Sequence, residues 1–452
     1  MSFDLLDSPE LRGFHRRLTV LSAAGMFLDG FDLTVIAVAL PFLTKKWGIS
    51  PELAGIVASS AVVGMLLGSL ILGHLTDRIG RKAMYLVDLL CFVVFAALTA
   101  VSQNVWEFIL FRFLLGIGIG ADYPISTTLL SEFVPASRRG AFVTAVGTCW
   151  FFGAVAAYLI GYLLLPVGPN AWRWMLLIGS AIALVVIFFR SRIPESPRWL
   201  ASQGRHREAS EVLMALTGKA EAPQVIARHA WSSLFKSPLL KLTLFIGIFW
   251  FCYDVAYYGI AMYTPTILKT FTSGSTRAAY LGSATISLLG IVGAGFGIYL
   301  VDRWGRRPLI IFAFGGLTVM LIALGVQPHP ALAILVVLFG LATLFANMGP
   351  GILSFVYATE AFPTSVRAGS VGLGTAVSRV GAILAIVVVP NLIHAWGLSA
   401  ALWCFAGLAA VAFVTCILLA PETKGQRLEQ ISGRDTQSDP VMSPAGVVSA
   451  ES

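Results

Sequence analysis

Charged residues are scarce in this chain. Asp, Glu, Lys and Arg together make up only 12% of its 452 residues, whereas a soluble globular protein carries about 25%. Hydrophobic residues account for 57%, and the mean hydropathy is +0.83. This composition excludes an ordinary soluble domain and indicates a chain whose surface faces lipid.

Residues that bind metals or cross-link a chain are also few. The five cysteines lie inside apolar runs without paired spacing, and the six histidines are scattered, which excludes a disulfide framework and an evident metal site. No phosphate-binding loop of the ATPase type is present. The net charge of +8 comes from short links between apolar runs and not from one basic face. We therefore expect no cofactor, no metal, no nucleic acid partner and no enzymatic activity.

Long apolar runs are abundant, and twelve of them are long enough to cross a bilayer as helices, for which about 20 residues suffice. They are residues 19–43, 53–75, 83–102, 106–132, 140–165, 172–190, 241–269, 277–300, 308–327, 331–361, 368–393 and 398–420. The sequence predicts an all-α membrane protein with twelve transmembrane helices. Breaks are expected in the seventh run between Gly259 and Pro265 and in the tenth run at Gly349-Pro350-Gly351.

One charged segment occurs twice. The pattern Asp-Arg-x-Gly-Arg, followed by Lys or Arg, lies within Gly73–Lys82 and again within Gly297–Arg307, and its aspartates are 225 residues apart. Two further pairs keep nearly this register: Glu132 with Glu360, and Pro194-Glu-Ser with Pro421-Glu-Thr. Three echoes in one register indicate an internal duplication, which predicts two pseudo-symmetric halves of six helices.

The distribution of Lys and Arg predicts the orientation, because these residues are enriched in cytoplasmic links. Most of them lie in the links from even-numbered to odd-numbered helices and in the central loop. Both termini are therefore predicted to be cytoplasmic, in a cell (inner) membrane. The predicted segments are a cytoplasmic start (1–18), a first half (19–190), a central loop (191–240) with a helical patch near 205–217, a second half (241–425) and a disordered tail (426–452).

The doubled motif, the six-plus-six helices and the central loop resemble the major facilitator superfamily over residues 19–425. The segments Pro194–Leu200 and Pro421–Gly425 resemble its sugar-porter and organic-ion members, and Gly116–Pro124 and Trp250–Gly259 resemble phosphate:proton symporters. The resemblance implies a carrier that works by alternating access, functions as a monomer and holds its solute at mid-membrane between the halves.

Two features depart from the phosphate symporters. Arg379 stands where those proteins carry a lysine, and Asp29-Gly-Phe-Asp32 also resembles the first helix of aromatic-acid:proton symporters. The resemblance therefore leaves the solute open among phosphate, a small organic anion, an aromatic acid and a sugar.

Ionisable side chains at membrane depth cost at least about 2.5–3.5 kcal/mol, so each needs a partner or a function. Asp32 and Arg112 match positions that resemble the acid and arginine of proton-coupled sugar porters, and we expect them, together with Asp29, to couple transport to protons. The alternative is a permanent structural ion pair. Asp88 is expected to snorkel or to pair with a nearby link arginine.

The solute site is predicted from a stripe on the seventh helix. Trp250, Asp254 and Tyr258 are spaced four residues apart, so they face one way. The resemblance adds two residues of the fourth helix, Asp122 and Tyr123, although Asp122 could instead cap a break at Pro124. Arg379 is expected to bind an anionic solute, and the alternative is a fixed tie between Arg379 and Asp254.

The charges of the doubled motif are predicted to form a conformational latch at the cytoplasmic end, closing in one state and opening in another. Glu132 is expected near Arg139, and Glu360 near Arg367. The alternative is that these charges only determine topology. The predicted latch residues are Gly73, Asp77, Arg78, Arg81, Glu132 and Arg139 in the first half and Asp302, Arg303, Arg306, Glu360 and Arg367 in the second.

Together these observations predict a secondary active transporter in the lipid bilayer, with a small anionic solute and protons as its partners. A symporter of sugars or other neutral metabolites is the alternative. A membrane sensor that binds without transport is a further one, disfavoured by the small size of the loop and tail.

Overall fold

The computed structural model describes residues 11–134, 139–218, 231–237, 239–327, 331–363 and 366–424. All regular elements within these residues are helices. The predicted tail at 426–452, most of the segment 1–18 and part of the central loop lie outside the described residues.

The first half contains one long helix for each of the first six apolar runs. These helices are α1 (Arg12–Trp47), α2 (Pro51–Ile79), α3 (Arg81–Val101), α4 (Val105–Phe133), α5 (Arg139–Leu164) and α6 (Ala171–Arg190). Two short helices follow them, α7 (Pro197–Ser202) and α8 (His206–Thr217). Helix α8 lies where the helical patch of the central loop was predicted.

The second half shows the predicted helix breaks. The seventh run forms α9 (Leu239–Ala261) and α10 (Thr264–Phe271), and the tenth forms α13 (Leu332–Met348) and α14 (Pro350–Glu360), separated at Gly349. Between them lie α11 (Thr276–Trp304) and α12 (Arg306–Gly325).

The last helix, α15 (Arg367–Leu419), contains the eleventh and twelfth spans, and its backbone leaves helical geometry at Gly397. In total, 12 helical stretches in the described residues are long and apolar enough to cross a membrane. This number confirms the prediction.

The two copies of the duplicated motif build the same helix start. Gly80 precedes α3 with φ 120°, and Gly305 precedes α12 with φ 97°; both values lie in the region that favours glycine. Glu195 then accepts the backbone N–H groups of the first two residues of α3, each at 3.1 Å, and Glu422 does the same for α12. A carboxylate at a helix N-terminus is stabilising, which explains why Pro-Glu-Ser and Pro-Glu-Thr recur with the motif.

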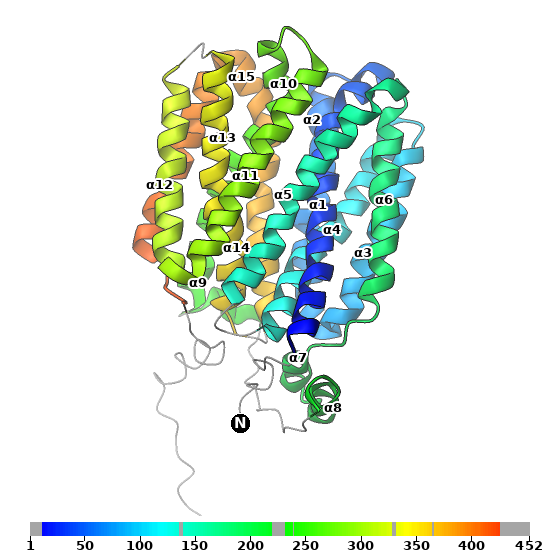
Figure 1. The fold of residues 1–452 in the computed structure, drawn as a ribbon, viewed down its shortest axis with the longest axis vertical. Coiled ribbons are helices and arrows are strands. Elements are labelled where there is room, and N and C mark those ends of the chain that lie inside the picture. Colours follow the sequence, from blue (N-terminus) through cyan, green and yellow to red (C-terminus); the bar gives the residue numbers. More distant parts are fainter. Residues whose placement is uncertain are drawn as a thin grey trace, which may run out of the picture.

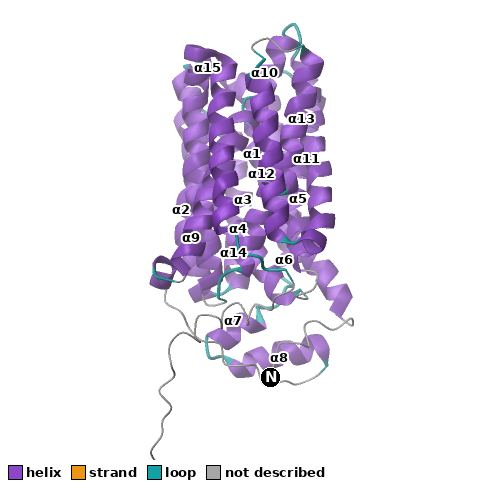
Figure 2. Cartoon of the chain, turned by 90° about the vertical axis from the view of Figure 1, so that its left-hand side faces the viewer, coloured by secondary structure: helices purple, strands orange, loops and turns teal. Residues whose placement is uncertain are grey.

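The helices run side by side in one elongated bundle (Figures 1 and 2). Helices α7 and α8 lie at one end of the bundle, which we call the α7/α8 end, and α10 lies at the other, which we call the α10 end. The halves meet mainly where α2 packs against α15 and α5 packs against α11. A pocket lined by residues of both halves lies along this interface.

Candidate functional site

A central pocket lies between the two halves. Tyr123 comes to it from α4, Trp250, Asp254 and Tyr258 from α9, and Arg379 from α15. It encloses about 350 Å³, including its opening. All three residues of the predicted α9 stripe line it, as the four-residue spacing requires.

Arg379 is the principal charge of the central pocket. Its Nη1 donates a hydrogen bond to the Tyr258 hydroxyl at 2.7 Å and lies 3.1 Å from an Asp254 carboxylate oxygen. The guanidinium carbon lies 5.2 Å from the ring centres of both Tyr123 and Tyr258. Its buried Nε has no hydrogen-bond partner in the described part of the chain. The tie to Asp254 therefore exists, but it engages one of the three guanidinium nitrogens.

Aromatic rings wall the pocket, and several of them were missed from the sequence. Phe355 of α14 packs against Trp250 and Tyr123, with ring centres 5.3 and 5.4 Å away. Trp150 of α5 lies 5.8 Å from Tyr257. Aromatic residues are common on every apolar run, so nothing in the sequence separates these wall residues from lipid-facing ones.

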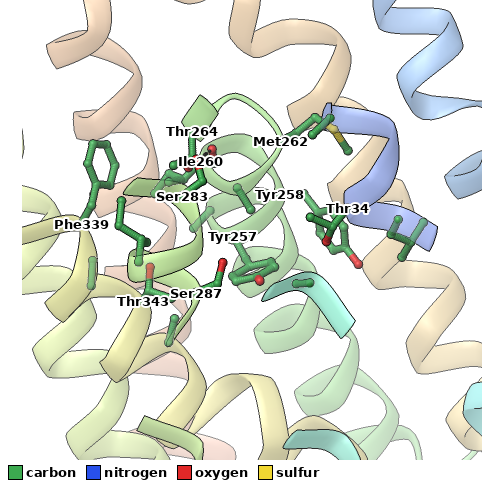
Figure 3. Close-up of a pocket in the computed structure, with 18 of the residues that line it drawn as sticks. Thr34, Tyr257, Tyr258, Ile260, Met262, Thr264, Ser283, Ser287, Phe339 and Thr343 are labelled. Atoms are coloured by element: carbon green, nitrogen blue, oxygen red, sulfur yellow. Dashed lines mark hydrogen bonds between the residues drawn. The ribbon is translucent and has the colours of Figure 1, made fainter. Parts of the chain in front are cut away.

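A second cavity lies next to the central pocket, and its lining includes Thr264 at the start of α10 (Figure 3). It encloses about 790 Å³, including its open mouth, and many of its lining residues carry hydroxyl groups. Ser283, Ser287 and Thr343 lie on one side of Tyr257 and Tyr258, and Thr34 lies on the other (Figure 3). The residues Trp150, Tyr253, Tyr257 and Tyr258 line both cavities. These aromatic side chains therefore form the partition between the two spaces.

The structure brings Asp32 and Arg112 together, as predicted. Nη1 of Arg112 lies 2.7 and 2.6 Å from the two carboxylate oxygens of Asp32, and both side chains are buried. This is a one-to-one ion pair inside the first half, between α1 and α4.

Asp122 does not line the central pocket, contrary to the expectation from the resemblance. It pairs with Arg190, the last residue of α6, at 2.8 Å. Successive residues of a helix point about 100° apart, so Tyr123 faces the pocket while Asp122 faces α6. Asp88 lies 3.5 Å from the same guanidinium, so its partner is the arginine that ends α6 and not an arginine of a link, as had been expected. Arg190 itself was missed, because its place beside the link after α6 made it look like an ordinary cytoplasmic charge.

The first copy of the duplicated motif forms a buried network that joins the two halves. Arg81 lies 3.0 Å from Asp77 and 3.2 Å from Glu132. Glu132 also lies 3.3 Å from Arg367 of the second half. Asp77 accepts the backbone N–H of Gly369 at 2.7 Å. Both links cross from the first half to α15.

The second copy repeats this arrangement on α11, α12 and α14. Arg306 lies 2.9 Å from Asp302 and 2.8 Å from Glu360. Asp302 accepts the backbone N–H of Ala141, at the start of α5, at 3.2 Å. This link crosses the interface in the opposite sense.

Two expectations for the latch need correction. Arg367 pairs with Glu132 of the other half and not with Glu360, because it opens α15 directly against the end of α4. Arg78 and Arg303 are exposed and lie outside the networks. Gly73 lies in the interface, where a Cβ on Gly372 would approach it to 3.3 Å. The side chain of Arg139 lies outside the described part.

At the α10 end the halves are joined by neutral groups. The Tyr280 hydroxyl of α11 donates to the Val38 carbonyl of α1 at 2.9 Å. The Tyr158 hydroxyl of α5 donates to the Ala261 carbonyl of α9 at 3.4 Å. The structure is therefore closed by ionic groups at one end and by tyrosines at the other.

Comparison with known proteins connects this architecture to membrane transport. Residues 18–433 match the family described as "Sugar (and other) transporter". The chain is 33% identical over 426 residues to the inner membrane metabolite transport protein YgcS of Escherichia coli, covering 93% of this chain and 94% of that one. It is 29% identical to the niacin transporter NiaP of Acinetobacter baylyi, covering 92% and 96%.

The fold is shared with a solved structure, the proton:xylose symporter XylE of the major facilitator superfamily. The TM-score is 0.79 at 22% identity, and the match covers 93% of this chain and 98% of that one.

Proposed function

The chain belongs to the sugar (and other) transporter family of the major facilitator superfamily, and from this premise we propose that it is a proton-coupled symporter of a small organic anion. It is an integral membrane secondary transporter and not an enzyme. Two properties are proposed beyond membership of this family: the solute is an anion, and protons are carried with it. We further propose that the protein lies in the inner membrane of the cell with its α7/α8 end in the cytoplasm. This orientation follows the distribution of Lys and Arg.

The observation that carries the proposal is Arg379 in the central pocket. A guanidinium does not lose its proton in a protein, so its charge must be compensated wherever it is buried. Asp254 meets only one of its nitrogens, and the planar fork suits a carboxylate bound at two points. Arg379 is thus placed to bind an anion while Asp254 holds it in position.

The walls of the pocket favour a flat organic acid over phosphate. Trp250, Phe355 and Tyr123 present ring faces and edges around the guanidinium, and aromatic walls with a few polar groups are typical of sites for small organic molecules. The relative whose name states niacin as its solute, at 29% identity, agrees with this choice. Among the solutes that the sequence motifs leave open, we therefore rank a carboxylate such as nicotinate ahead of phosphate.

Proton coupling is proposed at Asp32 and Arg112. While Asp32 is ionised it holds Arg112, and when Asp32 takes up a proton the pair loses its attraction and α1 is free to shift against α4. The acid must therefore exchange its proton once in each transport cycle.

The solute assignment is tested by uptake into proteoliposomes. Labelled nicotinate, benzoate, phosphate and xylose are compared under an imposed pH gradient. Arg379→Lys is expected to weaken uptake of the carried acid severalfold, and Arg379→Gln to abolish it nearly completely. Arg277→Gln, at an exposed arginine of the α10 end, is the matched control. Restored transport in the double variant Arg379→Leu with Asp254→Leu would overturn anion binding and favour a sugar.

The coupling assignment is tested with Asp32→Asn. This variant is expected to lose accumulation driven by the pH gradient while it still exchanges labelled for unlabelled solute. If Asp32→Asn still concentrates solute under the gradient, Asp32 serves as a structural partner of Arg112.

A further inference from the structure

Four ionisable side chains meet inside the first half, away from the central pocket. Asp29 of α1, Asp88 of α3 and Asp122 of α4 gather around Arg190 of α6, and none of these four residues, taken whole, is more than 3% exposed. A small cavity lined by the three aspartates lies between them. We call this set the aspartate cluster.

The guanidinium of Arg190 is firmly committed to one of the three acids. Arg190 meets Asp122 with two nitrogens, at 2.8 and 3.5 Å, and its Nε donates to the Leu21 carbonyl at 3.3 Å. It also stacks on the Tyr85 ring, 3.7 Å from its centre. The Ser126 hydroxyl donates a further bond to Asp122 at 2.8 Å. Asp122 is therefore the ionised partner of Arg190.

The other two acids have much less compensation. Asp88 lies 3.5 Å from Arg190 and accepts the backbone N–H of Leu89. Asp29 makes no ion pair among the described residues, and its buried Oδ2 has no hydrogen-bond partner there. Three ionised carboxylates beside one guanidinium would leave two uncompensated negative charges out of contact with water, which is strongly unfavourable.

We propose that the aspartate cluster is a second proton-binding site, separate from the Asp32–Arg112 pair, in which Asp29 holds the proton as a neutral carboxylic acid. Protonation of Asp29 removes one of the two negative charges that Arg190 alone leaves uncompensated, while Asp88 keeps its contacts with Arg190 and with the Leu89 N–H. Asp88 and Asp122 line the same cavity as Asp29, and Arg190, Asp32 and Arg379 are close enough to act on it electrostatically. Asp29 and Asp32 are one helical turn apart on α1, so one helix carries both proton sites.

The local packing is adapted to this cluster. A Cβ on Gly25 would collide with Arg190 and with Asp122, so glycine at this position admits the guanidinium to the space beside α1. Arg190 reaches in from the α7/α8 end of α6, whereas Arg112 lies near the opposite end of α4. The aspartate cluster therefore lies nearer to the α7/α8 end than the Asp32–Arg112 pair does. Use of this proton in transport rests on the proposed function, whereas protonation of Asp29 does not.

A bound cation is the competing explanation for three aspartates. It is disfavoured because the positive charge of Arg190 already lies within 3.5 Å of two of the three carboxylates. Within the described residues, no group of His, Cys, Asp and Glu has the arrangement of a metal site.

The proposal is tested on the purified, full-length protein without any solute. Dicyclohexylcarbodiimide modifies carboxylic acids that are protonated in apolar surroundings, and peptide mass spectrometry locates the adduct. At neutral pH we expect an adduct on Asp29, its absence in Asp29→Asn, and its persistence in Asp32→Asn and Asp88→Asn. Infrared spectra should show the carbonyl band of a protonated carboxylic acid, lost in Asp29→Asn and kept in Asp32→Asn.

Three results would overturn the proposal. The first is an adduct or infrared band that persists in Asp29→Asn, and the second is one that disappears only in Asp32→Asn. The third is labelling suppressed by sodium chloride but not by choline chloride, which would identify a cation site. If Asp29→Asn does not fold, the adduct and band of the wild-type protein and of Asp32→Asn decide the matter. Failure of the nicotinate uptake assay leaves this test unaffected, because it measures the resting protein.

Discussion

The two ends of the interface between the halves are closed by different chemistry. At the α7/α8 end, buried carboxylates and guanidinium groups link the halves through Glu132–Arg367, Asp77–Gly369 and Asp302–Ala141. At the α10 end, two tyrosine hydroxyls bond to backbone carbonyls. The two halves of one bundle are therefore joined by ionic interactions at one end and by neutral hydrogen bonds at the other.

Magnitudes support this contrast. Removing one member of a buried ion pair costs about 3–5 kcal/mol, because the remaining charge is left uncompensated. A neutral hydrogen bond contributes about 0.5–1.5 kcal/mol net. Opening the α7/α8 end therefore requires several charged groups to find new partners or water together, whereas opening the α10 end releases two neutral bonds.

Within the ionic end, the two copies of the motif are not equivalent. The side chain of Asp77 is 9% exposed, and that of Asp302 is 26% exposed. Asp77 also holds its cross-interface N–H at a shorter distance, 2.7 Å against 3.2 Å. The first copy is therefore the more buried and more closely bonded of the two, although the sequence repeats the motif almost unchanged.

The largest effect is expected from Arg367→Ala. Glu132 then keeps Arg81 but loses its partner across the interface, so the α7/α8 end should open. Spin labels at Ala83 and Arg307, both exposed at this end, should move apart in double electron–electron resonance, and the thermal midpoint should fall. Arg78→Ala removes an exposed arginine of the same link and serves as the control. Unchanged distances in Arg367→Ala would show that the network does not act as a latch.

An intermediate effect is expected from the two motif aspartates, and it sharpens the comparison between the copies. Asp77→Asn should increase the distance between the same two labels more than Asp302→Asn does, because Asp77 is more buried and holds its bond more closely. Solvent weakens the contribution of the partly exposed Asp302. Equal increases of the label distance in both variants would mean that the two copies contribute equally to joining the halves, despite their different burial.

The smallest effect, in the opposite sense, is expected from Tyr280→Phe. The change removes one hydroxyl–carbonyl bond of about 1 kcal/mol and should favour opening at the α10 end. Labels at Gln103 and Gln327, exposed at that end, report the opening, and those at Ala83 and Arg307 should stay together. Thr285→Val, which removes an exposed hydroxyl of the same helix, is the control. Opening at the α7/α8 end in Tyr280→Phe would contradict the division of roles between the ends.

Local sequence patterns determined a large part of this protein. Hydropathy alone located the twelve spans, because each helix must satisfy its own backbone within the bilayer. The repeated register predicted the two halves, and the four-residue spacing placed Trp250, Asp254 and Tyr258 on one face. The pairing of Asp32 with Arg112 was also expected, because a buried charge needs an opposite one and few are available.

Only the tertiary structure decided which groups meet across helices. Nothing in the sequence shows that Arg190 reaches inward while Arg78 and Arg303 remain exposed, or that Arg367 chooses Glu132 over Glu360. The opposite directions of Asp122 and Tyr123 follow from the rotation of α4 against its neighbours, and so does the choice of Trp150 and Phe355 as pocket walls. These partners are set by helix packing, since a long side chain reaches whatever its helix is turned toward.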